Sequence, residues 1–272
     1  MSVHLPWFRK RRRNQDVLTD LDIETVSRDV LYSDDAITEW GQDILGRKEL
    51  VQRLITSISG WPRQQPLVLA ITAPWGTGKT SVLNLLSKEL EASPGTIVIK
   101  FDPWFFNSAE GLIQGFFTVV EERLKTAPGF QLSEEGRRNW ARARRVLSSL
   151  PSVSLFGFGV DFSSLASDVP SLDEVKKSVS GLCQGIEQRV VVTFDDLDRL
   201  SSEDLRTALK LVKIWTGFAP FTYILSYARE PTEAKLKKEL DADPMLLQKL
   251  IQVEVSLPPA QPRSIGRWWM VL

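Results

Sequence analysis

The residues with the clearest chemical potential are the run Gly76-Thr77-Gly78-Lys79-Thr80. Glycine adopts backbone angles that other residues avoid, so the N–H groups of such a run can converge on one anion. The positive end of a following helix would add to the attraction. The lysine would then reach the β- and γ-phosphates of a nucleotide, and the threonine hydroxyl would bind Mg²⁺. The run therefore predicts a triphosphate-binding loop.

The flanking residues supply the strand and the helix that such a loop needs. Leu67 to Ile71 are an apolar run, and apolar residues at helical spacing follow the loop. This context favours a P-loop over a chance glycine-rich turn. The P-loop pattern is Gly, any four residues and Gly-Lys-Ser/Thr, and its first position here is Ala73. Alanine tolerates positive φ less well than glycine, so the start of the turn is expected to differ slightly.

Two acids, Asp195 and Asp196, follow the continuous apolar run Val190 to Phe194. Such a run is typical of a strand buried on both faces. Ligands of open α/β sheets bind beyond the carboxyl ends of the strands, so we expect these acids beside the P-loop. Asp195 is predicted to hold Mg²⁺ with Thr80, and Asp196 to orient or deprotonate the attacking water. The alternative is a strand that simply ends in an acidic turn. The predicted catalytic residues are Lys79, Asp195 and Asp196.

Composition limits the remaining choices. The 272 residues suffice for one α/β core with an insertion, and lysine plus arginine equal aspartate plus glutamate at 34 each. No bulk charge therefore favours nucleic acid or membrane. A single cysteine, Cys183, excludes an intramolecular disulfide framework and favours a reducing, cytoplasmic setting. With His4 as the only histidine, a His/Cys metal site is not expected.

Several stretches permit two interpretations. Asp102 to Phe106 would be a packed aromatic plug, with Asp102 capping a helix that begins near Ala109, or a functional element at the sheet edge. Arg229 would meet nucleotide or form a surface ion pair. The basic helix Glu134 to Ser149 is a solvated face or a contact for nucleic acid. The arginines of that helix are Arg137, Arg138, Arg142, Arg144 and Arg145.

The region after this basic helix is not predicted to span a membrane. Proline, glycine and Asp161 interrupt it, and apolar residues alternate from Phe156 to Phe162, which predicts a β-hairpin. A helix is expected over Ser171–Gln188. We therefore do not expect membrane association.

Three ordered stretches together resemble the KAP family of P-loop NTPases, and the resemblance covers about residues 33 to 258. They are Trp75–Ser81, Phe101–Trp104 and Asp195–Arg199, supported by Ser33–Ile37 and Asp43–Arg47. The resemblance implies a P-loop NTPase of the additional-strand, catalytic-carboxylate type, in which the strand Phe221–Tyr227 lies between the P-loop strand and the strand that ends at Asp195. It implies ATP and Mg²⁺ as ligands. The nucleotide-binding residues it implies are Pro74, Trp75, Gly76, Thr77, Gly78, Lys79, Thr80 and Ser81.

The family has variable inserted segments, and some bacterial members are linked to phage exclusion. One departure is Ala228, because the family often places an aspartate there. The expected organisation is a basic arm at 1–32, a core at 33–125 and 189–258 with a mostly parallel five-stranded sheet flanked by helices, a helical or β-hairpin insertion at 126–188, and a short tail at 259–272.

The expected function is Mg²⁺-dependent ATP hydrolysis as a switch or motor. A second copy of the chain or another protein would complete the site, because no arginine within the chain is an evident partner for the transition state. The alternative is a nucleotide-binding interaction module with little hydrolysis. A nucleotide kinase is disfavoured because no acceptor pocket or arginine-rich lid follows Phe221.

Overall fold

The computed structural model describes residues 35–63, 65–126, 188–216, 221–239 and 245–259, with isolated helical residues between 134 and 145. The chain divides after Asp35, and the description below concerns the unit that begins at Ala36. The predicted N-terminal arm, the hairpin at Phe156–Phe162, the helix at Ser171–Gln188 and the tail beyond Pro259 lie outside the described residues.

Five strands form one sheet, in the spatial order β2-β3-β4-β1-β5, and every pairing is parallel. β4 pairs with both β1 and β3, which confirms its predicted place in the sheet. The strands are β1 (Leu67–Thr72), β2 (Thr96–Phe101), β3 (Arg189–Phe194), β4 (Phe221–Tyr227) and β5 (Val253–Ser256).

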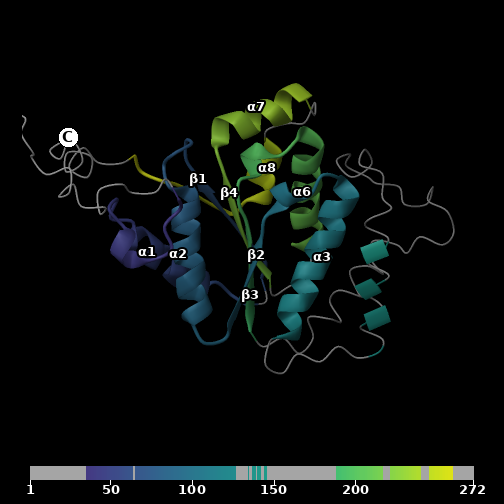
Figure 1. Ribbon diagram of the computed structural model, residues 1–272, viewed down its shortest axis with the longest axis horizontal. Helices are drawn as coiled ribbons and strands as arrows, with labels where there is room; N and C mark the ends of the chain where they lie inside the picture. Colours follow the sequence, from purple (N-terminus) through teal and green to yellow (C-terminus); the bar gives the residue numbers. More distant parts are fainter. Residues whose placement is uncertain are drawn as a thin grey trace, which may run out of the picture. The chain divides into compact units, whose positions relative to one another are not determined.

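Helices cover both faces of the sheet, as the continuous apolar strands require. α1 and α2 lie on one face, and α3 and α6 lie on the other (Figure 1). Successive side chains of each strand alternate between the two cores: Leu69 packs toward α2, and Ala70 toward α3. The helices are α1 (Lys48–Gly60), α2 (Lys79–Ala92), α3 (Ala109–Lys125), α6 (Ser202–Trp215), α7 (Arg229–Glu239) and α8 (Met245–Leu250).

The core on the α3 side is rich in aromatic rings, and the inserted basic helix docks on it through Trp140. The Trp140 ring lies 4.8 Å from Phe117 and 5.7 Å from Trp215, and its indole N–H donates to Glu121 at 2.8 Å. Arg137 of the same helix is exposed and pairs with Glu134 at 2.8 Å. The described residues of this insertion are helical, as predicted.

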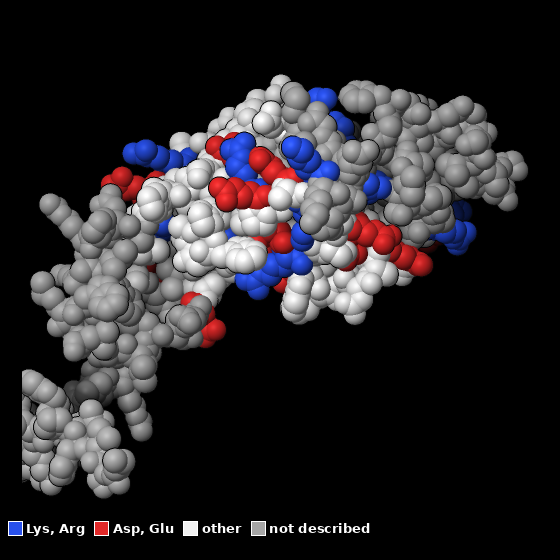
Figure 2. Space-filling view, turned by 90° about the horizontal axis from the view of Figure 1, so that it is seen from above, with Lys and Arg blue, Asp and Glu red and all other residues white. Residues whose placement is uncertain are grey.

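In the stretches that the structure describes, no helix has the length and apolar character needed to cross a membrane. The face of the molecule seen from above Figure 1 carries lysine, arginine, aspartate and glutamate side chains intermingled rather than in patches of one sign (Figure 2).

Candidate functional site

The predicted phosphate-binding loop joins β1 to α2, and its two glycines have left-handed backbones. Gly76 has φ of 74° and Gly78 has φ of 88°, and Gly78 is the N-cap of α2. Among the non-glycine residues that the structure describes, only Asp196 has a positive φ, so Ala73 does not. Ala73 therefore has an ordinary backbone, and the alanine found where the P-loop pattern has glycine carries no conformational cost.

Lys79 points back into this loop. Its ammonium donates to the carbonyls of Ala73 at 3.1 Å and Pro74 at 3.3 Å, and the residue is 6% exposed. Pro74, Trp75 and Gly76 are exposed. A buried cation beneath an exposed, glycine-containing loop is the arrangement that a phosphate chain requires.

The segment before α1 packs against the loop and α2. The backbone N–H of Ile37 donates to the Ser81 hydroxyl at 3.3 Å, and the buried Arg47 guanidinium donates to the Thr77 carbonyl at 3.5 Å. Burial lowers the pKa of Arg47, while Asp43 opposes that shift. Sequence reasoning gave Arg47 no role, although Gly46-Arg47 belonged to the pattern that carried the family resemblance. Thr80 lies half-buried in the first turn of α2.

Substitution of Gly78 by alanine tests the loop's dependence on left-handed backbone. We expect a loss of about 1–2 kcal/mol in the free energy of unfolding, because an L-residue is strained at this φ. Steric room is available, since an added Cβ would meet no atom closer than 3.9 Å. The matched control is Gly60→Ala at the end of α1, where φ is not positive and space is open. Urea unfolding measures both; equal effects would contradict the assignment.

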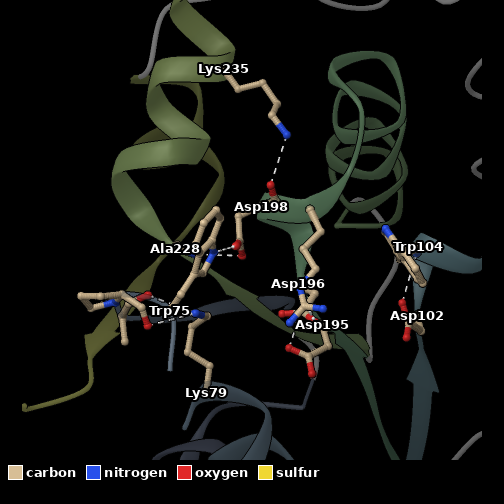
Figure 3. Close-up of polar contacts among 12 residues, drawn as sticks. Trp75, Lys79, Asp102, Trp104, Asp195, Asp196, Asp198, Ala228 and Lys235 are labelled. Atoms are coloured by element: carbon tan, nitrogen blue, oxygen red, sulfur yellow. Dashed lines mark hydrogen bonds and ion pairs between the residues drawn. The ribbon is translucent and has the colours of Figure 1, made fainter. Parts of the chain in front are cut away.

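The two predicted acids follow β3 and face the loop across the end of β4 (Figure 3). Asp196 has φ of 51°, and its carboxylate lies 3.0 Å from the Arg199 guanidinium. Burial, and then repulsion from Asp195, raises the pKa of Asp196, while Arg199 and Lys79 oppose the shift. Lys79 and both acids are thus close enough to interact electrostatically.

Asp102 lies near the same acids. The expectation that it caps the helix near Ala109 is wrong. It caps the short 3₁₀ turn Pro103–Phe105 by accepting from the Trp104 N–H at 3.1 Å, while Ser108 caps α3. Burial, opposed by this hydrogen bond, raises the pKa of Asp102, and Asp195 raises it further.

The packed-plug alternative for Asp102 to Phe106 is also wrong in large part, and the alternative of a functional element stays a prediction. Trp104 is 56% exposed and Phe105 is 74% exposed. Only Phe106 packs inward, with its ring centroid 5.4 Å from that of Phe101.

Of the two predicted roles of Arg229, contact with nucleotide or a surface ion pair, the structure shows the ion pair. Its guanidinium lies 2.8 Å from Glu233 and 3.2 Å from Glu254, which itself accepts from the Thr72 hydroxyl at 3.1 Å. The hydrogen bond to Glu233, followed by the charge of Glu254, raises the pKa of Arg229.

A connection that sequence reasoning missed is made by the buried Asp198. Its carboxylate accepts hydrogen bonds from the indole N–H of Trp75 and from the backbone N–H of Ala228, the latter at 2.9 Å (Figure 3). In the sequence, Asp198 is only one member of the run Asp195–Arg199. No local pattern could show a contact between residues 123 positions apart.

A parallel sheet with a glycine-rich loop after β1, acids after β3 and β4 between them is the fold of a P-loop NTPase. The sequence profile described as the KAP family P-loop domain matches residues 47–270. The chain belongs to the KAP family of P-loop NTPases, as the motifs suggested.

A curated relative and two solved structures are similar to this chain. The Phage T7 exclusion protein of Escherichia coli (strain K12) is 26% identical over 255 residues, which are 83% of this chain and 34% of the relative. Cdc6p of Pyrobaculum aerophilum is 13% identical, with a TM-score of 0.50 over 90% of this chain and 52% of that one. The ORC2 protein of Aeropyrum pernix is 13% identical, with a TM-score of 0.46 over 83% of this chain and 51% of that one. The chain therefore spans about a third of the curated relative and half of these structures.

Proposed function

We propose that this chain binds and hydrolyses ATP with Mg²⁺ at the loop between β1 and α2. The observation that carries the proposal is that the buried Lys79 ammonium and the carboxylate of Asp196 both lie at the carboxyl edge of one parallel sheet, close enough to interact electrostatically. A P-loop lysine and a nearby carboxylate are the two parts that hydrolysis of a bound triphosphate needs from the protein.

Each predicted residue has a distinct task in this proposal. The amides from Trp75 to Thr80 and the Lys79 ammonium bind and neutralise the phosphates. Asp196 orients a water molecule and accepts its proton. Mg²⁺ is commonly held by one or two carboxylates together with phosphate oxygens, and the Thr80 hydroxyl and Asp195 are the donors that fit it here. When bound, the metal would neutralise charge on the phosphates.

We propose a switch or motor role, in exclusion of phage, for this activity. The support is family membership together with the name of the curated relative, which is a phage exclusion protein.

A second copy of the chain or another protein is proposed to complete the site. The support is that two arginines of the described part of the chain are already paired with acids. Arg199 pairs with Asp196, and Arg229 pairs with Glu233 and Glu254. Contact of the basic helix with nucleic acid, through Arg137, Arg138, Arg142, Arg144 and Arg145, stays a prediction.

The alternative is a nucleotide-binding interaction module with little hydrolysis. The ion pair between Asp196 and Arg199 favours it, because a carboxylate held by a cation is a weaker base. Phosphate release from ATP, measured with and without Mg²⁺, separates the two. Hydrolysis supports the enzyme, and nucleotide binding without phosphate release supports the module.

The pH dependence of hydrolysis tests the role of Asp196. A base must be ionised, so the rate falls as pH drops through its pKa, and the raised pKa of Asp196 places this fall above the ordinary aspartate range near ~3.9. Arg199 lowers that pKa, so Arg199→Ala should move the acid limb to still higher pH. The control Arg229→Ala, whose partners are Glu233 and Glu254, should leave the limb in place. A limb that Arg199→Ala moves to lower pH would refute the assignment.

A further inference from the structure

Asp198 is a buried carboxylate that joins segments far apart in the chain. It is 4% exposed, and one oxygen accepts from the Ala228 N–H at 2.9 Å while the other accepts from the Trp75 indole. An ionised carboxylate removed from water is costly unless hydrogen bonds compensate it. The two N–H donors supply this compensation, so the three groups act as one unit.

Trp75 depends on this contact for its position. The side chain is 68% exposed, so burial of its ring contributes little to holding it in place. The indole N–H points to the Asp198 carboxylate in Figure 3. Since Trp75 immediately precedes Gly76, the hydrogen bond to Asp198 restrains the first half of the phosphate-binding loop.

The other end of the contact is equally well anchored. Asp198 belongs to the 3₁₀ turn Leu197–Arg199, which directly follows Asp195 and Asp196. Lys235 of α7 donates to the backbone carbonyls of Asp198, at 3.1 Å, and of Leu200. The turn directly after the acids is therefore fixed to α7 and to the residue that follows β4, and the loop is fixed to the turn.

We propose that Asp198 is a positioning residue, which sets the placement of the P-loop relative to Asp195 and Asp196 through the Trp75 indole. Its effect on catalysis rests on the function proposed above. The phosphates would be held by the loop, and the base by the turn after β3. A bond between the two parts fixes their separation, to which the rate of an in-line attack is sensitive.

Trp75→Phe removes the indole N–H but keeps an aromatic ring. We expect kcat to fall about 10- to 100-fold, because small misplacements of reacting groups have effects of this size. Nucleotide affinity should stay nearly unchanged, since Lys79 and the loop amides remain. Asp198→Asn keeps an acceptor for Ala228 but offers an amide N–H to the indole, so it should cause the same loss. The double variant should be no slower than the slower single variant, because both remove one interaction.

Amide hydrogen exchange of the nucleotide-free protein tests the restraint without relying on hydrolysis. In Trp75→Phe, exchange should become faster in residues 75–78 and 195–199, with the melting temperature little changed. Trp104→Phe is the matched control: its indole is exposed on the same edge, and it should alter neither segment. Trp75→Phe changes an exposed side chain, so the test stands even if Asp198→Asn does not fold.

The outcomes separate this inference from the proposed function. Exchange left unchanged by Trp75→Phe in both segments would overturn the role of Asp198, whether or not the protein hydrolyses ATP. Additive losses of kcat in the double variant would overturn it as well. Faster exchange in a protein that releases no phosphate would support the restraint and refute the proposed hydrolysis.

Discussion

Replacement of Lys79 by alanine is expected to reduce ATP turnover by roughly 10²–10³-fold, the usual effect of removing a preorganised charge from a reacting oxyanion. Lys79 is the buried cation whose ammonium lies against the carbonyls of Ala73 and Pro74 inside the loop. Its loss removes the positive charge that would face the β- and γ-phosphates. Nucleotide affinity, measured by titration calorimetry, should weaken together with the rate.

Lys88→Ala is the matched control for this experiment. Lys88 lies on the same helix, α2, but is exposed and pairs with Glu39 at 2.5 Å. An exposed pair of this kind contributes little to stability, so fold and turnover should be preserved. Wild-type turnover in Lys79→Ala would mean that hydrolysis occurs elsewhere or by a contaminant.

The second large effect is expected from Asp196→Asn. Loss of a general base typically costs about 10²–10⁴-fold in rate, whereas nucleotide binding should persist because the loop is intact. Asparagine is the appropriate substitution because it tolerates the left-handed backbone that Asp196 adopts at φ of 51°. Single-turnover phosphate release and nucleotide titration on the same preparation measure both quantities.

Asp102→Asn provides the comparison. Asp102 is a second carboxylate near Asp195 with a raised pKa, but its structural task is to accept from the Trp104 N–H. Asparagine can still accept that hydrogen bond, so the rate should change little. If the two variants hydrolysed ATP equally slowly, the role of general base could not be assigned to Asp196 alone. If Asp196→Asn were fully active, the acids would not take part in hydrolysis.

The parts of the site that follow from local pattern were predictable. The apolar run at Leu67 predicted β1, and the run that precedes Asp195 predicted β3, because strands buried on both faces need continuous apolar sequence. Glycines at 76 and 78 predicted backbone angles that the structure confirms. The place of β4 between β1 and β3 followed from the family resemblance and is also confirmed.

Some local features could not be predicted because two nearby residues can take the same structural role. Asp102 and Ser108 can both cap a helix, and Pro103 decides between them because proline favours the position directly after a cap. The resulting 3₁₀ turn leaves Trp104 and Phe105 exposed, although their apolar character predicted packing.

Contacts between distant residues have no periodicity in the sequence. The bond from Trp75 to Asp198 depends on the sheet order, which brings the end of β1 near the end of β3. The docking of Trp140 against Phe117 and Trp215 likewise depends on the packed core.

The most direct test of the central claim is phosphate release from ATP by the purified chain with Mg²⁺, followed across protein concentration. The account predicts Mg²⁺-dependent release that falls by roughly 10²–10³-fold in Lys79→Ala, with a rate per molecule that rises as copies of the chain complete one another's sites. A concentration-independent rate would leave the active site in place but contradict its completion by a second copy. Absence of both nucleotide binding and phosphate release would contradict the account itself.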